Sequence, residues 1–97
     1  MKRLDRKDVL QAADRKDLSA QAKAAEVLYA AEQWLGEHIG HEFYWQPKSW
    51  KQGTLRIAVK DPASALQIYA AGEQLLEHLQ TRYPDYRFRE VRTEMVA

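Results

Sequence analysis

The fold is decided by residues 46–62, which read QPKSWKQGTLRIAVKDP. Gly53 marks a turn, and the residues after it alternate between apolar and polar, which is the period of a half-buried strand. The apolar members of this alternation are Leu55, Ile57 and Val59. Asp61 and Pro62 then end the strand, because Pro cannot donate to a β-ladder. Asp as N-cap with Pro at the first helical position predicts that a helix begins here.

The composition indicates a single folded domain. A chain of 97 residues has room for one hydrophobic core, and a hydrophobic content of 45% argues against disorder. The chain contains no cysteine, which excludes disulfides and thiolate metal sites and fits a reducing compartment. The formal net charge is only +1, so any electrostatic function depends on where the charges lie.

The sequence predicts a cytoplasmic protein without a membrane segment. No apolar run approaches the roughly 18 residues that a membrane span needs. The charged start at residues 1–8 is not followed by an apolar region, so we expect no signal peptide.

The N-terminal part of the chain predicts a charged arm followed by an amphipathic helix. Residues 1–17 carry many charges of both signs and are expected to form a charged arm or a short helix. Residues 18–39 place alanines and large apolar residues three and four apart, which puts them on one face of a helix. Ser19 is a candidate N-cap, and Gly36 and Gly40 bracket the expected end.

A second helix is predicted over residues 62–82. Its expected apolar stripe consists of Ala65, Leu66, Tyr69, Leu75, Leu76 and Leu79. Gly72 lies on the same side, which indicates either close approach of another element or simple tolerance of a glycine. Residues 83–85, Tyr-Pro-Asp, end the helix and turn the chain.

Three strands are predicted. Residues 41–46 form the first, and Pro47 is expected to close it. A loop at residues 48–53 joins it to the strand at residues 54–60 in an antiparallel hairpin. Residues 86–92 form the last strand, and Val91 falls out of phase with the aromatic residues before it, which indicates a bulge or an apolar residue on the open face.

The predicted fold is a two-layer α+β domain of order α-β-β-α-β. A three-stranded sheet with one apolar face is covered on that face by the two helices. The second and third strands are joined through a helix, so they are parallel if they are neighbours. The domain is expected to span residues 18–93, with a tail at residues 94–97.

Several residues along this order form a pattern shared with a known family. They are Trp34, Ile39-Gly40, the run from Pro47 to Val59, Ala65 with Ile68, and Val91-Arg92. On these positions the sequence resembles the DciA-like family, bacterial proteins associated with the replicative helicase. The run from Pro47 to Val59 is the most specific part. The chain departs from the pattern at Ser64, where the family often has tryptophan.

The resemblance implies a fold, partners and a function class. The implied fold is like a K-homology domain of the second type, and the implied partners are a replicative helicase and single-stranded DNA or RNA. We expect no cofactor. The Gly-x-x-Gly loop with which ordinary K-homology domains clamp a nucleic-acid backbone is absent from this sequence.

A basic surface is the main candidate site. Lysines and arginines follow the hairpin and the last strand, with one tryptophan between them: Lys48, Trp50, Lys51, Arg56, Lys60, Arg87, Arg89 and Arg92. If the two strands are neighbours, the basic side chains converge on the open face of the sheet, where they would attract phosphates. An aromatic residue between lysines is typical of single-strand binders, whereas the structural alternative is that Trp50 folds back over the core.

The other candidate sites are weaker. His38 and His41 straddle a helix end and His78 is distant, so we expect no metal site. The carboxylates lie among lysines and arginines at helical spacings, which is typical of a solvated face, and no nucleophile or phosphate-binding motif is present. We therefore expect no catalysis. Trp50 and Tyr83 are the aromatic residues expected to be exposed, where they would anchor a partner.

Two interpretations follow from these observations. The first is a non-enzymatic DNA-replication accessory protein that binds single-stranded nucleic acid, the replicative helicase, or both. The second is a protein-interaction or scaffold domain, including a homodimer, with no nucleic-acid contact. One continuous positive face favours the first, whereas a face broken by Glu90 or Asp85 favours the second.

Overall fold

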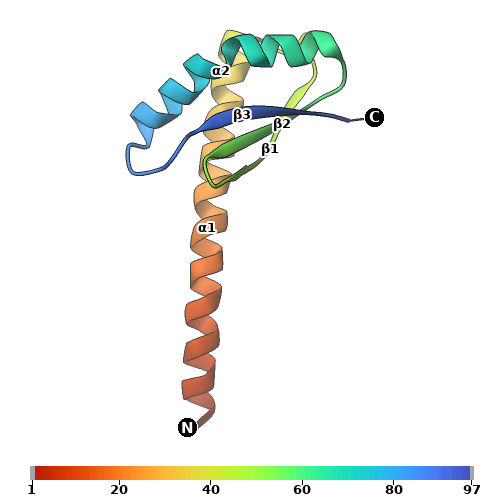
Figure 1. The fold of residues 1–97 in the computed structure, drawn as a ribbon. Helices are drawn as coiled ribbons and strands as arrows, with labels where there is room; N and C mark the ends of the chain where they lie inside the picture. The colour runs from red at the N-terminus through yellow and green to blue at the C-terminus, as the bar shows by residue number, and fades with distance from the viewer. Residues whose placement is uncertain (1, 97) are drawn as a thin grey trace.

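The computed structural model describes residues 2–96, with side chains from residue 19 onward. The elements are α1 (Lys2–His38), β1 (Trp45–Lys51), β2 (Thr54–Val59), α2 (Pro62–Arg82) and β3 (Glu90–Met95). This order confirms the predicted α-β-β-α-β arrangement (Figure 1). The predicted boundaries of the domain at residues 18 and 93, and the likeness to a K-homology domain, stay predictions.

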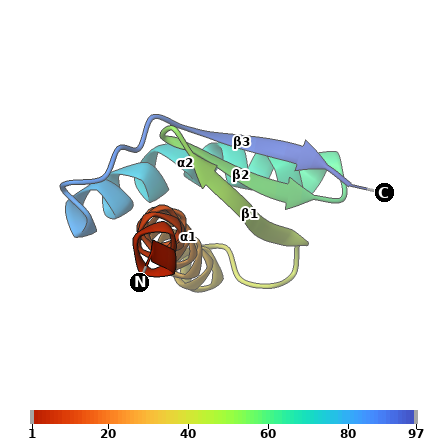
Figure 2. The same cartoon turned by 90° about the horizontal axis from the view of Figure 1, so that it is seen from below.

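The sheet has the order β1-β2-β3. β1 pairs with β2 antiparallel, and β2 pairs with β3 parallel, as predicted for strands joined through a helix. α1 packs mainly against β1 and α2 mainly against β3, as Figures 1 and 2 show. The alternating residues Leu55, Ile57 and Val59 are fully buried beneath the helices, so the predicted half-buried strand is confirmed.

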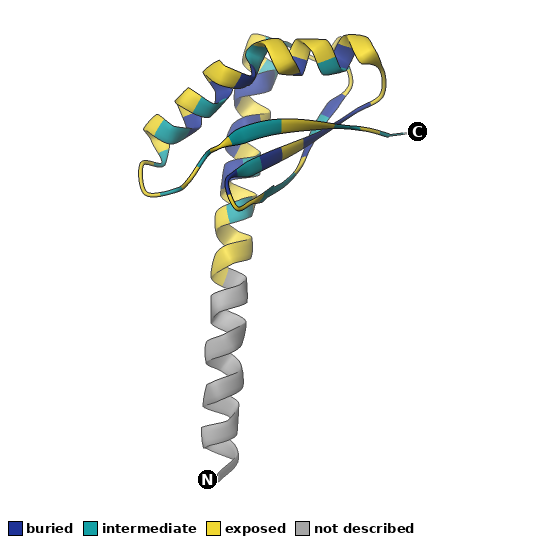
Figure 3. Cartoon of the chain, viewed as in Figure 1, coloured by how far each residue is buried: buried dark blue, intermediate teal, exposed yellow. Residues whose placement is uncertain are grey.

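Each helix contributes one face to the core (Figure 3). The buried residues of α1 recur three and four apart: Val27, Ala30, Ala31, Trp34 and Leu35. Those of α2 are Ser64, Ile68, Gly72, Leu75 and Leu79. The predicted stripe of α2 was therefore wrong at Leu66 and Tyr69, which are 65% and 82% exposed. The buried stripe instead consists of the residues that face β3, and it begins one residue earlier than predicted, at Ser64.

The helix boundaries follow their capping residues. Asp61 is the N-cap of α2, and its Oδ1 accepts a hydrogen bond of 2.7 Å from the backbone N–H of Ser64. α1 ends at His38, and Gly40 follows it with φ of +83°, the left-handed conformation typical of a helix terminus. The prediction that a helix begins at Ser19 was wrong, because α1 begins at Lys2.

The hairpin is tighter than predicted. β1 begins at Trp45 rather than at His41, and it passes through Pro47 instead of ending there. Proline is tolerated because β1 is an edge strand and its register shifts between Pro47 and Ser49. The predicted six-residue loop is a two-residue turn, in which Gln52 and Gly53 have φ of +52° and +84°. A turn with positive φ at both central residues has a backbone twist that matches the right-handed twist of the flanking strands.

The last strand begins later than predicted. β3 spans Glu90–Met95, so the preceding residues 86–89 are not in a strand, and Glu94 and Met95 are not a tail. The N–H groups of Arg89 and Glu90 both donate to the carbonyl of Gly53, at 2.7 and 3.2 Å, and this contact starts the ladder. The aromatic residues that suggested an earlier strand pack against Trp50 instead.

Within the described part of the chain, no helix is long and apolar enough to cross a membrane.

Candidate nucleic-acid interface

Trp50 lies between the hairpin and the segment before β3. It pairs with Leu55 in the sheet register, which places its side chain on the core side. Its indole stacks on the rings of Tyr86 and Phe88, with 5.4 Å between ring centroids in each case. The indole N–H donates to the backbone carbonyl of Arg87 at 3.0 Å. Trp50 is therefore half-buried and folded back over the core, and the prediction of an exposed aromatic was wrong.

The same contacts bring two arginines beside the hairpin turn. The carbonyl of Gly53 accepts the N–H of Arg89, so the chain at residues 87–89 runs against the turn. A Cβ atom at Gly53 would lie 2.7 Å from Cγ of Arg89 and 3.1 Å from Cγ of Arg87. Both arginines are exposed but precede β3, so they do not join the open face of the sheet as predicted.

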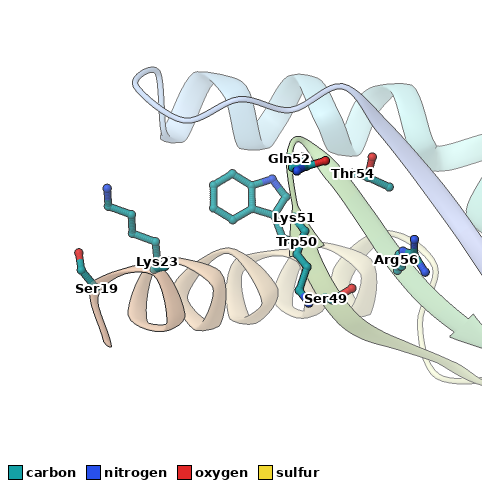
Figure 4. A pocket seen from close by; sticks show the side chains of 9 residues that line it. Ser19, Lys23, Ser49, Trp50, Lys51, Gln52, Thr54 and Arg56 are labelled. Atoms are coloured by element: carbon teal, nitrogen blue, oxygen red, sulfur yellow. The ribbon is translucent and has the colours of Figure 1, made fainter. Parts of the chain in front are cut away.

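A groove opens between α1 and the tip of the hairpin (Figure 4). Its volume is about 920 Å³, and we call it the hairpin-tip groove. Its lining residues are Ser19, Ala20, Lys23, Ser49, Trp50, Lys51, Gln52, Thr54 and Arg56. Among the side chains that the structure describes, those lining the groove include three cations and no carboxylate. The groove therefore presents positive charge beside an indole.

Lys23 is the groove cation that the sequence did not predict. It lies on α1, and its Nζ is 5.6 Å from the ring centroid of Tyr86, which Trp50 also contacts. Packing removes Tyr86 from water, which raises the pKa of its phenol above 10.0, and nearby Glu26 adds to the effect. Lys23 lies outside the apolar stripe of its helix, and no local pattern indicates that it faces the hairpin.

The open face of the sheet carries paired charges. Arg56 and Arg92 are neighbours in the register of β2 and β3, as the predicted convergence requires. However, Arg56 forms an ion pair with Glu94 at 2.8 Å, and Arg92 forms one with Glu90 at 3.1 Å. The hydrogen bond from Arg92 lowers the pKa of the Glu90 carboxyl below 4.5. The face is therefore mixed in charge rather than continuously positive.

Comparison with known proteins adds the decisive observation. The family model described as "Dna[CI] antecedent, DciA" matches residues 6–93, which is nearly the whole chain. The chain belongs to the DciA family. This family is associated with the loading of the replicative helicase and is not a known enzyme family. A search of curated proteins finds no match to the chain.

The remaining predicted cations of this DciA domain lie apart from the groove. Lys60 follows β2, and its Nζ is 4.6 Å from the ring centroid of Tyr44. Lys48 is exposed at the irregularity of β1. The structure thus brings Trp50, Lys51 and Arg56 into one groove, places Arg87 and Arg89 beside the turn, and leaves Lys48, Lys60 and Arg92 elsewhere.

The histidines of the DciA domain pack on aromatic rings. His38 stacks on Trp34 with 3.9 Å between centroids, and its Nδ1 lies 2.8 Å from the Trp34 carbonyl oxygen. His41 stacks on Trp45 at 5.4 Å. The two imidazoles therefore have separate structural contacts, and among the described side chains no group of three or more His, Cys, Asp or Glu residues is placed to hold a metal ion.

Proposed function

We propose that this protein is a non-enzymatic accessory factor of DNA replication that binds single-stranded nucleic acid and acts with the replicative helicase in the cytoplasm. Membership of the DciA family supports the replication role. The observation that carries nucleic-acid binding is the hairpin-tip groove, where Lys23, Lys51 and Arg56 surround a half-buried tryptophan. Arg87 and Arg89 extend this positive charge around the turn.

The mechanism is electrostatic. Lysine and arginine side chains neutralise phosphates and release counterions, which supplies affinity without sequence preference. Lys23 and Lys51 approach the groove from α1 and from β1, so a strand lying in it has cations on both sides. The exposed edge of Trp50 gives the groove an apolar wall against which a base packs. Arg56 contributes less than the lysines because Glu94 neutralises it.

A salt titration with a fluorescent single-stranded oligonucleotide tests the groove. Each cation that neutralises a phosphate contributes about 0.7 to the slope of log affinity against log salt for single strands. Lys23→Gln and Lys51→Gln should each weaken binding and reduce the slope by about that amount. Lys60→Gln is the matched control, because it removes the same charge near Tyr44, away from the groove.

Two results would contradict the nucleic-acid part of the proposal. One is the absence of binding at low salt. The other is an equal loss of affinity for Lys60→Gln and for the two groove variants. A separate pull-down from the native host tests the partner, and failure to recover the replicative helicase with the protein would contradict the helicase part.

A second candidate function is a protein-interaction domain with no nucleic-acid contact. The mixed charge of the open face favours it, since Glu90 and Glu94 pair with the arginines there. Leu66 and Tyr69 also lie exposed on α2, and exposed apolar side chains are typical of binding surfaces. The oligonucleotide titration separates the two functions, because this candidate predicts no binding at any salt concentration.

A further inference from the structure

The two edges of the sheet are built differently. β1 carries Pro47, a register shift after it, and the exposed lysines Lys48 and Lys51. These are features that prevent an edge strand from pairing with another chain. β3, the other edge, contains no proline, and its six residues pair with β2 without a shift in register. Of the two edges, β3 is thus the better suited to accept another strand.

The hydrogen bonds of β3 show which backbone groups face outward. The N–H of Glu90 donates to the Gly53 carbonyl at 3.2 Å, and the N–H of Val96 donates to the Val59 carbonyl at 2.8 Å. Backbone groups alternate in direction along a strand, so the even-numbered residues face β2. The residues with outward N–H and C=O groups are therefore Val91, Thr93 and Met95.

We propose that β3 pairs antiparallel with β3 of a second copy of this chain, with the two-fold axis at Thr93. The outward residues are symmetric about this position, so every outward N–H and C=O of the strand finds a partner. Thr93 then lies opposite the partner's Thr93, and Val91 lies opposite the partner's Met95. The result is a continuous six-stranded sheet across two protomers.

The side chains are self-complementary in this register. Arg92 lies opposite the partner's Glu94, and Glu94 opposite the partner's Arg92, so each protomer contributes one cation and one anion. Opposite charges directly across two strands stabilise the pairing, whereas like charges oppose it. Arg56 already pairs with Glu94 within the protomer, so each Glu94 would lie between Arg56 and the partner's Arg92.

The flank of the same edge carries apolar side chains that a second copy would cover. Leu66 and Tyr69 lie one turn apart on α2 and are 65% and 82% exposed, and Met95 in β3 is 58% exposed. A groove of about 410 Å³ between α2 and β3 is lined in part by Tyr69, Gly72, Leu76 and Val91. Its charged lining residues, Glu73, Arg89 and Glu90, are of both signs, so this surface can complement itself across a two-fold axis.

Disulfide trapping tests the register directly, because the natural chain has no cysteine. Directly opposite residues of a hydrogen-bonded antiparallel pair have Cα atoms about 5.5 Å apart, within the range that a disulfide spans. Oxidation should therefore cross-link the Thr93→Cys variant into a dimer. Val91→Cys is the register control, because its two copies would be offset by about 13 Å along the strands, at roughly 3.3 Å per residue. Lys48→Cys, on the β1 edge, is the control for random collision.

Sedimentation of the wild-type chain over a concentration series gives the second measurement. The wild type should dimerise reversibly, and Thr93→Pro should raise the dimer Kd by about tenfold or more, since proline removes an outward N–H without touching the β2 ladder. Circular dichroism is the control that checks whether this variant still folds. A monomeric wild type at all concentrations, or equal cross-linking of the Thr93, Val91 and Lys48 variants, would overturn the proposal.

Discussion

Alanine substitution at two glycines separates backbone strain from side-chain crowding at the hairpin turn. Gly53 in the turn and Gly40 after α1 have nearly the same φ, +84° and +83°. An alanine in this left-handed region costs about 1 kcal/mol relative to glycine. This cost should apply equally at the two positions.

The surroundings of the two glycines differ. A Cβ atom at Gly40 would meet nothing within 4 Å, whereas one at Gly53 would lie 2.7 Å from Cγ of Arg89 and 3.1 Å from Cγ of Arg87. The arginine side chains are flexible, so they move at a cost of about 1 kcal/mol for an unfavourable rotamer. We therefore expect Gly40→Ala to lower the free energy of unfolding by about 1 kcal/mol and Gly53→Ala by about 2 kcal/mol.

Thermal unfolding followed by circular dichroism measures the difference. For a domain of this size, 1 kcal/mol corresponds to about 4–8 °C in Tm, so the two variants should be separated by about that interval. Gly53→Ala should also weaken oligonucleotide binding, because it displaces Arg87 and Arg89, while Gly40→Ala should not. Equal Tm values for the two variants would refute the crowding argument.

Three further predictions concern stability. Gly72→Ala should stabilise the protein by about 0.5–1 kcal/mol, because Gly72 is within α2 and a Cβ there would lie 3.7 Å from Cβ of Val91, an ordinary contact; urea denaturation measures it. Trp50→Phe should cost about 1 kcal/mol through loss of the hydrogen bond to the Arg87 carbonyl while keeping an aromatic ring, and the same denaturation curve reports it. The capping hydrogen bond lowers the pKa of Asp61 below 3.8, so its carboxylate stabilises the fold above that pH and loses this effect as the pH falls below it. Asp61→Asn keeps a capping oxygen, so a pH series should show a shallower loss of stability in acid than for the wild type.

Local signals in the sequence were sufficient for most of the fold. The alternation of residues 54–60 predicted β2, and Asp61 with Pro62 predicted the start of α2. These signals work because side-chain periodicity and capping act between residues that are close along the chain. The order of elements followed from them, and the parallel pairing of β2 with β3 followed from the intervening helix.

The errors lie where long-range contacts compete with local preference. Pro47 suggests a strand end, but an irregular edge strand accommodates it. Tyr86 and Phe88 suggest an early β3, but they stack on Trp50, more than thirty residues away in the chain. Tyr69 belongs by spacing to an apolar face of α2, yet only the position of β3 decides which face is buried.

The features of the candidate site also separate into those that follow from local sequence and those that depend on long-range packing. The sequence by itself determined that basic residues surround Trp50 and that the hairpin displays them, because neighbours in a strand stay neighbours in the fold. Only the tertiary structure decided that Trp50 faces inward, that Lys23 of α1 lines the groove beside Lys51, and that Glu90 and Glu94 neutralise the open face. The physical reason is that these contacts depend on how the helices and strands pack, and packing of distant segments has no local periodicity from which to infer it.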